Sequence, residues 1–579
     1  MLVSFIASLS LVIPTAGTGP LVDGPSSAVW SKALAAGDIP GLSVAKVEAG
    51  SVKWSNALGR RDATDRSANA QKVNSETVFE AASLGKPIVA IAILSLVDRG
   101  ELSLDEKAHS IVELKGLIDS RRTDITLRML LSHSSGLSFN QPRLESKPGT
   151  RFSYSTLGFR YLQQIAEKKL GTSLEDWAQR TLFQPLQMNR SSFVYAEKFA
   201  GNRASGVNWL LRPQSQMTSA AGTGAFDLIT CATDYSRLWA AVLDGKVLKE
   251  SSLRQMFTPQ TGITGEFFDS AVPKKSRAEL AAGLGILLQR QGNKWIGFQW
   301  GDNGGSSSLL LANREKRDAL VYLTNAQDGL HSAEALARIG GMKDVGASWV
   351  GYEQISTTYR RAWKRITLAL DREPKSGVEE FRKLTAQDET TAKQVARNLG
   401  YFNVFRGQSV FAEPFFRVAS TTDLADGSLL LEWSKSLVLA GKVREAAEVQ
   451  AQAFKKDASI RGVPSLAEWV KLAEADLKEE VPMSTTAVMR GGKFGNYRIE
   501  LEPTGQPVLV APSGRRPLAL LGSGEFLSRD LAYRVKFERE KVLVTLAGQA
   551  TETLQPGGGG KERQNGEDSS QNGPESYSL

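Results

Sequence analysis

The sequence predicts a mixed α/β fold in which an antiparallel sheet is flanked by helices, followed by a helical segment and a small C-terminal antiparallel β-barrel or sheet. Three observations support this prediction. Segments with alternating and with helical apolar spacing share the region from 25 to about 345, strand patterns vanish after about 355, and short alternating segments return near 490. A chain of 579 residues is also too long for one hydrophobic core, so several domains are expected.

Two strand pairs predict the sheet of the first region. Gly41–Val47 and Val52–Trp54 have the composition of strands, and Gly50 lies in the turn between them, where glycine adopts positive φ without strain. Near the end of the region, Ser308–Ala312 and Ala319–Leu323 are apolar runs typical of buried strands, separated by a charged turn. Strands joined by such short turns predict antiparallel pairing.

Helices are predicted at three places where apolar side chains recur every three or four residues: Pro87–Arg99, Leu127–Leu131 and Thr156–Leu170. Proline is tolerated only in the first turn of a helix. The first of these helices must therefore begin a few residues before Pro87, near Ser83.

The remainder of the chain changes character twice. Leu429–Ala440 and Val443–Lys455 predict a helix–turn–helix that resembles one tetratricopeptide-like unit, without a regular array. Short alternating strands such as Tyr497–Leu501 and Tyr533–Phe537 follow, separated by Gly and Pro. The expected organisation is a signal segment at 1–22, a first domain at 25–347, a helical region at 355–480, a small β domain at 488–550 and a disordered tail at 556–579.

The composition favours an ordinary soluble globular protein. The net charge of +9 comes from scattered Lys and Arg, which favours a solvated surface over a nucleic-acid partner. Cys231 is the single cysteine, so no internal disulfide forms, and no Cys–His cluster exists to bind zinc. We expect no cofactor and no metal.

The N-terminus is similar to a signal peptide. No charged residue precedes Asp23, and Leu2–Ile13 is mostly apolar and is followed by small residues. The usual Lys or Arg near Met1 is missing, so a packed or disordered N-terminal segment is the alternative. The segment is short for a membrane span, and no other stretch of the sequence is long and apolar enough for one. We therefore expect a periplasmic or secreted protein without a stable span after signal removal; a cytoplasmic location is the alternative.

Ser83 and Lys86 form the strongest local indication of chemistry. A serine hydroxyl is a poor nucleophile unless a base takes its proton. Residues three apart share a face of a helix, and the positive end of the helix dipole favours developing negative charge. A lysine held there among apolar groups has a lowered pKa and can act as the base. Ser-x-x-Lys also occurs by chance in a long chain, so the motif alone favours a capping serine and a solvated lysine.

The surroundings of Ser83 resemble the serine β-lactamase, carboxypeptidase and esterase family, closest to its class C branch. The resemblance spans residues 38–330, and the matching sequence segments occur in the same order as in the family. These segments are Ile39–Val44, Thr77–Phe79, Leu94–Asp105, Ile125–Leu137, Pro148–Ser155, Ala221–Gly224, Gly283–Gly285 and Leu323–Asn325. The resemblance implies a β-lactamase/transpeptidase-like domain that acts on a small molecule or a peptide through an acyl-serine intermediate, with cell-wall material as a further candidate partner.

The resemblance also implies a role for Tyr154. In the family, a tyrosine two residues before an asparagine supports proton transfer to and from the serine. Tyr154 occupies the tyrosine position, and Thr156 stands where the asparagine is expected. Threonine can still form a hydrogen bond to a substrate, although it has no amide.

A third family motif places Lys or His, a small polar residue and Gly on a strand opposite the serine, where it holds the substrate's carboxylate or carbonyl. The matching segment is Trp300–Gly305, in which Asp302 occupies the Lys or His position. The resemblance implies that Asp302, Asn303, Gly304 and Gly305 bind the substrate. The backbone N–H groups of Ser83 and Gly305 would then form the oxyanion hole.

Asp302 is the departure from the family with the clearest chemical consequence. We expect its carboxylate to face the pocket, where it could pair with Lys86 and would repel a carboxylate substrate. This expectation disfavours β-lactamase and carboxypeptidase activity and favours esters or amides without a negative charge. The alternative is that Asp302 lies in a turn and points to solvent, since Gly-Asp-Asn-Gly is also a turn sequence.

His133 suggests a Ser-His-Asp triad, but the sequence disfavours that interpretation. The chain has three histidines and no Gly-x-Ser-x-Gly elbow, and His133 matches a family position thought structural. The glycine pairs near Gly222 and Gly304 are not followed by Gly-Lys-Ser/Thr, so no phosphate loop is predicted.

Three functions follow from these observations. The leading hypothesis is an exported serine hydrolase. The second is a binding or sensory protein of the same fold, for peptidoglycan or β-lactams, whose catalysis is impaired by the changes at Asp302 and Thr156. The third is a secreted scaffold whose C-terminal regions recruit a partner. The joint presence of Ser83, Lys86 and Tyr154 favours the hydrolase.

Overall fold

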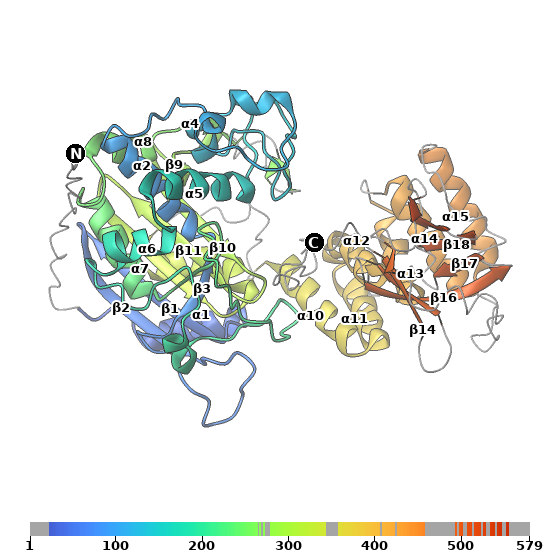
Figure 1. Cartoon of the computed structure of the whole chain (residues 1–579). Helices are drawn as coiled ribbons and strands as arrows, with labels where there is room; N and C mark the ends of the chain where they lie inside the picture. The colour runs from blue at the N-terminus through green and yellow to red at the C-terminus, as the bar shows by residue number, and fades with distance from the viewer. Residues whose placement is uncertain are drawn as a thin grey trace. The chain divides into compact units, whose positions relative to one another are not determined.

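The computed structural model describes residues 22–342, 357–457 and the strands between 493 and 554, apart from gaps at 264–265, 268–269, 272–277, 406–407 and 423–424. The chain divides into two compact units, Met1–Thr357 and Thr358–Leu579 (Figure 1). The expected signal segment and C-terminal tail lie outside the described residues. The two units are described separately below.

An eight-stranded antiparallel sheet forms the centre of the first unit, in the order β2-β1-β12-β11-β10-β9-β8-β5. The predicted hairpin is confirmed as β1 (Gly41–Glu48) and β2 (Ser51–Gly59), with Gly50 at a φ of 79° in its turn. The second predicted pair is also confirmed. The other strands of the sheet are β5 (Thr261–Gly262), β8 (Leu280–Ala282), β9 (Leu287–Gln291), β10 (Lys294–Asp302), β11 (Ser307–Asn313) and β12 (Asp318–Thr324).

Successive side chains of a strand point to opposite faces of the sheet. Both faces of this sheet are apolar, and helices cover each of them. On β11, Leu311 belongs to a core shared with α1 (Ser27–Gly37) and α9 (Ala333–Ile339). Its neighbour Leu310 belongs to a larger core shared with α2 (Gly85–Asp98) and α7 (Ala232–Leu243). Near-continuous apolar strands are therefore required, as the sequence has them.

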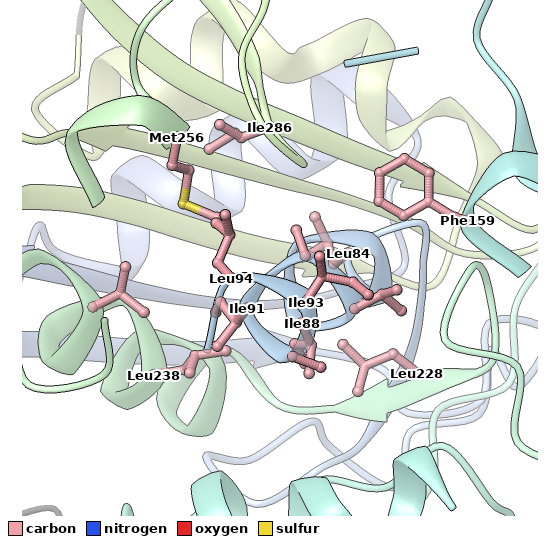
Figure 2. Close-up of a cluster of buried hydrophobic side chains, with 14 of the residues drawn as sticks. Leu84, Ile88, Ile91, Ile93, Leu94, Phe159, Leu228, Leu238, Met256 and Ile286 are labelled. Carbon is pink, nitrogen blue, oxygen red and sulfur yellow. The ribbon is translucent and has the colours of Figure 1, made fainter. Parts of the chain in front are cut away.

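Helix α2 is the buried centre of the larger core and begins two residues after Ser83. Almost all of its side chains are buried, and Figure 2 shows Ile88, Ile91 and Leu94 among side chains from the surrounding elements. The predicted helix is thus confirmed, with its start moved to Gly85. A short strand, β3 (Phe79–Ala82), leads into Ser83 and pairs with β4 (Leu228–Thr230).

Helix α5 spans Thr156–Leu170, the range that the apolar spacing predicts. The Ser155 hydroxyl caps it by accepting a hydrogen bond from the N–H of Gly158, and Gly171 ends it at a φ of 66°. The remaining helices of the first unit include α3 (Ala108–Ile111), α4 (Leu127–Leu131), α6 (Leu174–Ala178) and α8 (Glu250–Met256).

The second unit contains helices followed by strands. Its helices are α10 (Thr358–Arg372), α11 (Pro374–Gln387), α12 (Glu389–Phe405), α13 (Glu413–Ala419), α14 (Gly427–Leu439) and α15 (Val443–Lys456). The predicted helix–turn–helix corresponds to α14 and α15. An antiparallel sheet follows, with its eight strands paired in chain order. Its strands are β13 (Lys493–Phe494), β14 (Tyr497–Leu501), β15 (Pro507–Ala511), β16 (Gly514–Gly522), β17 (Glu525–Ser528), β18 (Tyr533–Glu538), β19 (Lys541–Leu546) and β20 (Glu552–Leu554). Of the helices in the described ranges, none has the length and apolar content that crossing a bilayer demands.

Candidate active site

Ser83 lies in the turn between β3 and α2, with its hydroxyl directly beside the amine of Lys86. Lys86 Nζ is 2.8 Å from Ser83 Oγ and 2.8 Å from the carbonyl oxygen of Ala225. Ala82, just before the serine, has a φ of 48°, a conformation that costs energy for a residue other than glycine. Ser83 is only partly buried, so its hydroxyl can meet a ligand. The structure therefore brings the predicted serine and lysine together.

Lys86 is completely buried, and burial alone lowers its pKa from 10.5 to about 7. Its amine lies 5.1 Å from the centre of the Tyr154 ring and 6.0 Å from that of Phe159. Among the described residues no carboxylate pairs with it, so its charged form has no counter-charge to offset the loss of hydration. Near neutral pH a large part of the amine is therefore free to accept a proton.

Tyr154 is the third side chain at this point. Its hydroxyl forms a hydrogen bond with Ser83 and accepts another from the Gln299 amide at 3.1 Å. These bonds lower its pKa, but burial outweighs them and raises the pKa to about 12. The phenol thus keeps its proton across the physiological range. Thr156, two residues later, is the buried first residue of α5.

His133 supports Tyr154. Its ring stacks on the tyrosine ring with centres 4.3 Å apart, and its Nδ1 accepts a hydrogen bond from the N–H of Ser155 at 3.1 Å. Burial and the nearby charge of Lys86 lower the pKa of His133 well below 6.5. A neutral ring whose Nδ1 is occupied by the backbone orients the tyrosine, which agrees with the structural role that the sequence favoured.

The expectation for Asp302 is corrected by the structure. Its carboxylate accepts a hydrogen bond from the N–H of Gly304 at 2.7 Å, within the turn after β10, and does not pair with Lys86. The polar side chain that meets Tyr154 is Gln299, three residues earlier on the same strand. Gln299 and Gly301 therefore lie beside Tyr154 and the strand that leads into the serine, three residues before the Asp302 and Gly304 that the sequence suggested.

Gly301 explains why this displacement matters. A Cβ at Gly301 would lie 2.2 Å from the carbonyl oxygen of Ala81, so only glycine lets β10 cross β3 beside the serine. The pairing of β9 with β10 ends at Phe298. The next residue of β10, Gln299, instead contacts Tyr154 through its side chain. Gly305 lies further on, where a Cβ would meet the side chain of Gln214 at 2.7 Å.

Asn303 and Gly304 belong to the turn after the strand. The N–H of Asn303 donates to the carbonyl oxygen of Ser306 at 3.1 Å, and Gly304 has a φ of 75°. The Asn303 amide donates to the Glu80 carboxylate at 3.4 Å and to the Phe226 carbonyl at 3.5 Å. Both residues border the site, and the Asn303 side chain is bound to the protein itself.

Sequence analysis missed two groups of this site: Gln299 and the carbonyl oxygen of Ala225. A polar Gln within the apolar run of β10 was a signal for the first, since such a residue is buried at a cost unless it has partners. The second has no side-chain signal, because a backbone carbonyl acts. Its context was the expected glycine turn at Ala221–Gly224, where the Gly224 carbonyl approaches Gly85 so closely that a Cβ there would lie 2.2 Å away. No group of His, Cys, Asp or Glu in the described ranges is placed to hold a metal ion.

An antiparallel sheet covered by helices, with a serine and a buried lysine at the start of its central helix, is the arrangement expected for a β-lactamase-like serine hydrolase. A protein-family model described as Beta-lactamase matches residues 28–340, more than half of the chain. The chain belongs to the beta-lactamase family, whose fold is an antiparallel sheet flanked by helices.

Individual relatives share only part of the sequence. The chain is 22% identical to Penicillin-binding protein 4* of Bacillus subtilis over 340 residues, covering 51% of this chain and 70% of that protein. It is 28% identical to Lovastatin esterase of Penicillium rubens over 318 residues, covering 45% and 77%. A solved class C beta-lactamase is 20% identical, with a TM-score of 0.46, and covers 54% of this chain and 93% of its own. The names include a penicillin-binding protein and an esterase, so membership alone does not choose the substrate.

Proposed function

We propose that this protein is an exported serine hydrolase that cleaves uncharged esters or amides through an acyl-Ser83 intermediate. The main support is the contact of the Ser83 hydroxyl with a fully buried Lys86 whose pKa is lowered to about 7. The apolar segment Leu2–Ile13 supports export to the periplasm or the outside, with a cytoplasmic location as the alternative.

In the proposed mechanism, Lys86 takes the proton of Ser83 while the serine oxygen attacks the substrate carbonyl carbon. The N–H groups of Ser83 and Asp302 stabilise the resulting oxyanion; Asp302 replaces Gly305 because it follows Gly301, the glycine at the crossing with β3. The protonated lysine and the phenol of Tyr154 return the proton to the leaving group. Water then attacks the acyl-serine, with Lys86 again as base.

The surroundings of the serine favour a substrate without negative charge. Gln299 presents a neutral amide at the position where the family motif has Lys or His, so no cation is offered there to a substrate carboxylate. The Phe139 ring is 44% exposed and stacks on the buried Tyr154 ring, so it offers an apolar contact to an acyl group. The hypothesis of an impaired enzyme loses its main argument, because Asp302 does not pair with Lys86.

Labelling with a fluorophosphonate tests the proposal directly. The parent protein is expected to gain one phosphonyl group at Ser83 with loss of fluoride, and Ser83→Ala to gain none, because the nucleophile is removed. Intact-mass spectrometry measures the adduct, and peptide mapping locates it. Hydrolysis of a short neutral ester should fall by about three orders of magnitude or more in Ser83→Ala. Equal hydrolysis in both proteins would place the reaction elsewhere.

The pH dependence of acylation should follow Lys86. Its free amine is the active form, so the rate should rise with pH through about 7 and then level off. Because the pKa of Tyr154 is about 12, no descending limb is expected between about pH 8 and 10. The measurement is the initial rate of neutral ester hydrolysis from pH 5 to 10, with Ser83→Ala as the blank. An ascending limb near 10, the range of an ordinary lysine, would contradict the proposal.

A further inference from the structure

Glu80 makes a set of contacts beside the site that the proposed mechanism does not use. It lies on β3, three residues before Ser83. One carboxylate oxygen accepts hydrogen bonds from the Arg203 guanidinium at 2.6 Å and from the N–H of Met217 at 2.8 Å. The other accepts from the Asn303 amide at 3.4 Å. The side chains of Glu80 and Arg203 are 11% and 3% exposed, so a charged pair is held with little water around it.

Arg203 and Met217 are the two ends of one surface segment, residues 203–217, called here the rim loop. One carboxylate oxygen of Glu80 thus binds both ends of this loop. Within the loop, the N–H of Gln214 donates to the carbonyl oxygen of Gly206. The backbone at Gly206 touches the turn after β10, since a Cβ there would lie 1.9 Å from the Gly305 carbonyl oxygen. The rim loop and that turn are therefore packed against each other.

Asn303 connects this arrangement to the reacting groups. It follows Asp302, whose N–H is the proposed oxyanion donor. Its amide lies between the Glu80 carboxylate and the carbonyl oxygen of Phe226, the residue after Ala225, which holds Lys86. Movement of Asn303 would therefore shift the oxyanion donor relative to the strand that leads into Ser83.

We propose that Glu80 is a positioning residue that ties the rim loop and the oxyanion-forming turn to the strand bearing the nucleophile. This inference rests on the proposed function, since it assigns Glu80 a role in aligning that site. Glu80 touches no reacting atom; it acts through Asn303 and Arg203. A buried carboxylate suits this task because charge-assisted hydrogen bonds to two or three donors are shorter and stronger than neutral ones.

The test exchanges donor and acceptor between residues 80 and 303. Asn303→Asp sets a second carboxylate against Glu80 and should slow fluorophosphonate labelling of Ser83 by about tenfold or more through misplacement of the oxyanion donor. In the double variant Glu80→Gln/Asn303→Asp, the new amide oxygen can still accept from Arg203 and Met217, while its NH₂ donates to the new carboxylate. Labelling should return to within about threefold of the parent rate. A residue needed only for stability would show no such rescue.

Asn293→Asp, the same substitution in the exposed turn between β9 and β10, is the matched control and should label at the parent rate. If Asn303→Asp does not fold, Asn303→Ala replaces it and should also be slowed, since the contact with Glu80 is lost. A parent rate in the folded residue-303 variant, or a double variant as slow as Asn303→Asp, would overturn the inference. An unlabelled parent protein would instead overturn the proposed function.

Discussion

Replacing Lys86 with methionine is expected to lower neutral ester hydrolysis by about three orders of magnitude while making the protein more stable. The folded state holds this lysine with a pKa of about 7, whereas an unfolded lysine keeps about 10.5. Between these values the unfolded state binds more protons, so the cost to folding is greatest below about pH 7 and is lost as the pH rises from 7 to 10.5. At about 1.4 kcal/mol for each pH unit, the cost at pH 7.5 is on the order of 4 kcal/mol. The measurements are the ester hydrolysis rate and the thermal midpoint at pH 7.5.

Lys46 offers a matched control for this experiment. It is a second buried lysine, on β1, and burial is the largest cause of its lowered pKa. Lys46→Met should change stability in the same direction and leave ester hydrolysis unchanged, because the side chain belongs to neither the Ser83 contacts nor those of Tyr154. If Lys86→Met kept the parent rate, Lys86 would not be the base. If Lys86→Met were also less stable than the parent protein, burial of the lysine charge would not destabilise the fold as assumed.

Local rules predicted the elements of the first unit well. Helix α5 has the predicted bounds because its apolar period, its Ser155 cap and the glycine after it all agree. The hairpin of β1 and β2 follows from a turn where glycine adopts positive φ. Strands with weaker patterns, such as β3 and β8, were not predicted, because pairing with distant strands defines them more than their own residues do.

The site was predictable where chemistry is local and unpredictable where it depends on register. Ser83 and Lys86 are three apart at a helix start, so their proximity follows from the sequence. The spacing of the motif did not distinguish Gln299 from Asp302, because each precedes a glycine by two residues. Only the crossing of β10 over β3 shows that Gly301 is the glycine beside the serine. A carbonyl such as that of Ala225 leaves no trace in the sequence at all.

Replacing Gln299 with lysine is expected to shift the substrate preference towards anions. The side chain at this position contacts the Tyr154 hydroxyl, which itself contacts Ser83. An ammonium here would lie near the carboxylate of a penicillin bound at the serine, and a charge pair at close range is worth about 1–4 kcal/mol in a partly hydrated site. The ratio of acylation rates for penicillin and a neutral ester should therefore rise by about fivefold to several hundredfold. Intact-mass spectrometry of the acyl-enzyme measures both rates.

Gln299→Glu has the opposite charge at the same place and should lower this ratio, which separates electrostatics from the loss of the amide. Asp302→Asn tests the position that the sequence first suggested. Its carboxylate is bound to the N–H of Gly304, so removing the charge should change the ratio less than either substitution at Gln299. If the ratio changed in Asp302→Asn but was the same in Gln299→Lys and Gln299→Glu, Asp302 would be the residue that determines specificity. The preference for uncharged substrates would then depend on repulsion by that carboxylate, as the sequence alone suggested.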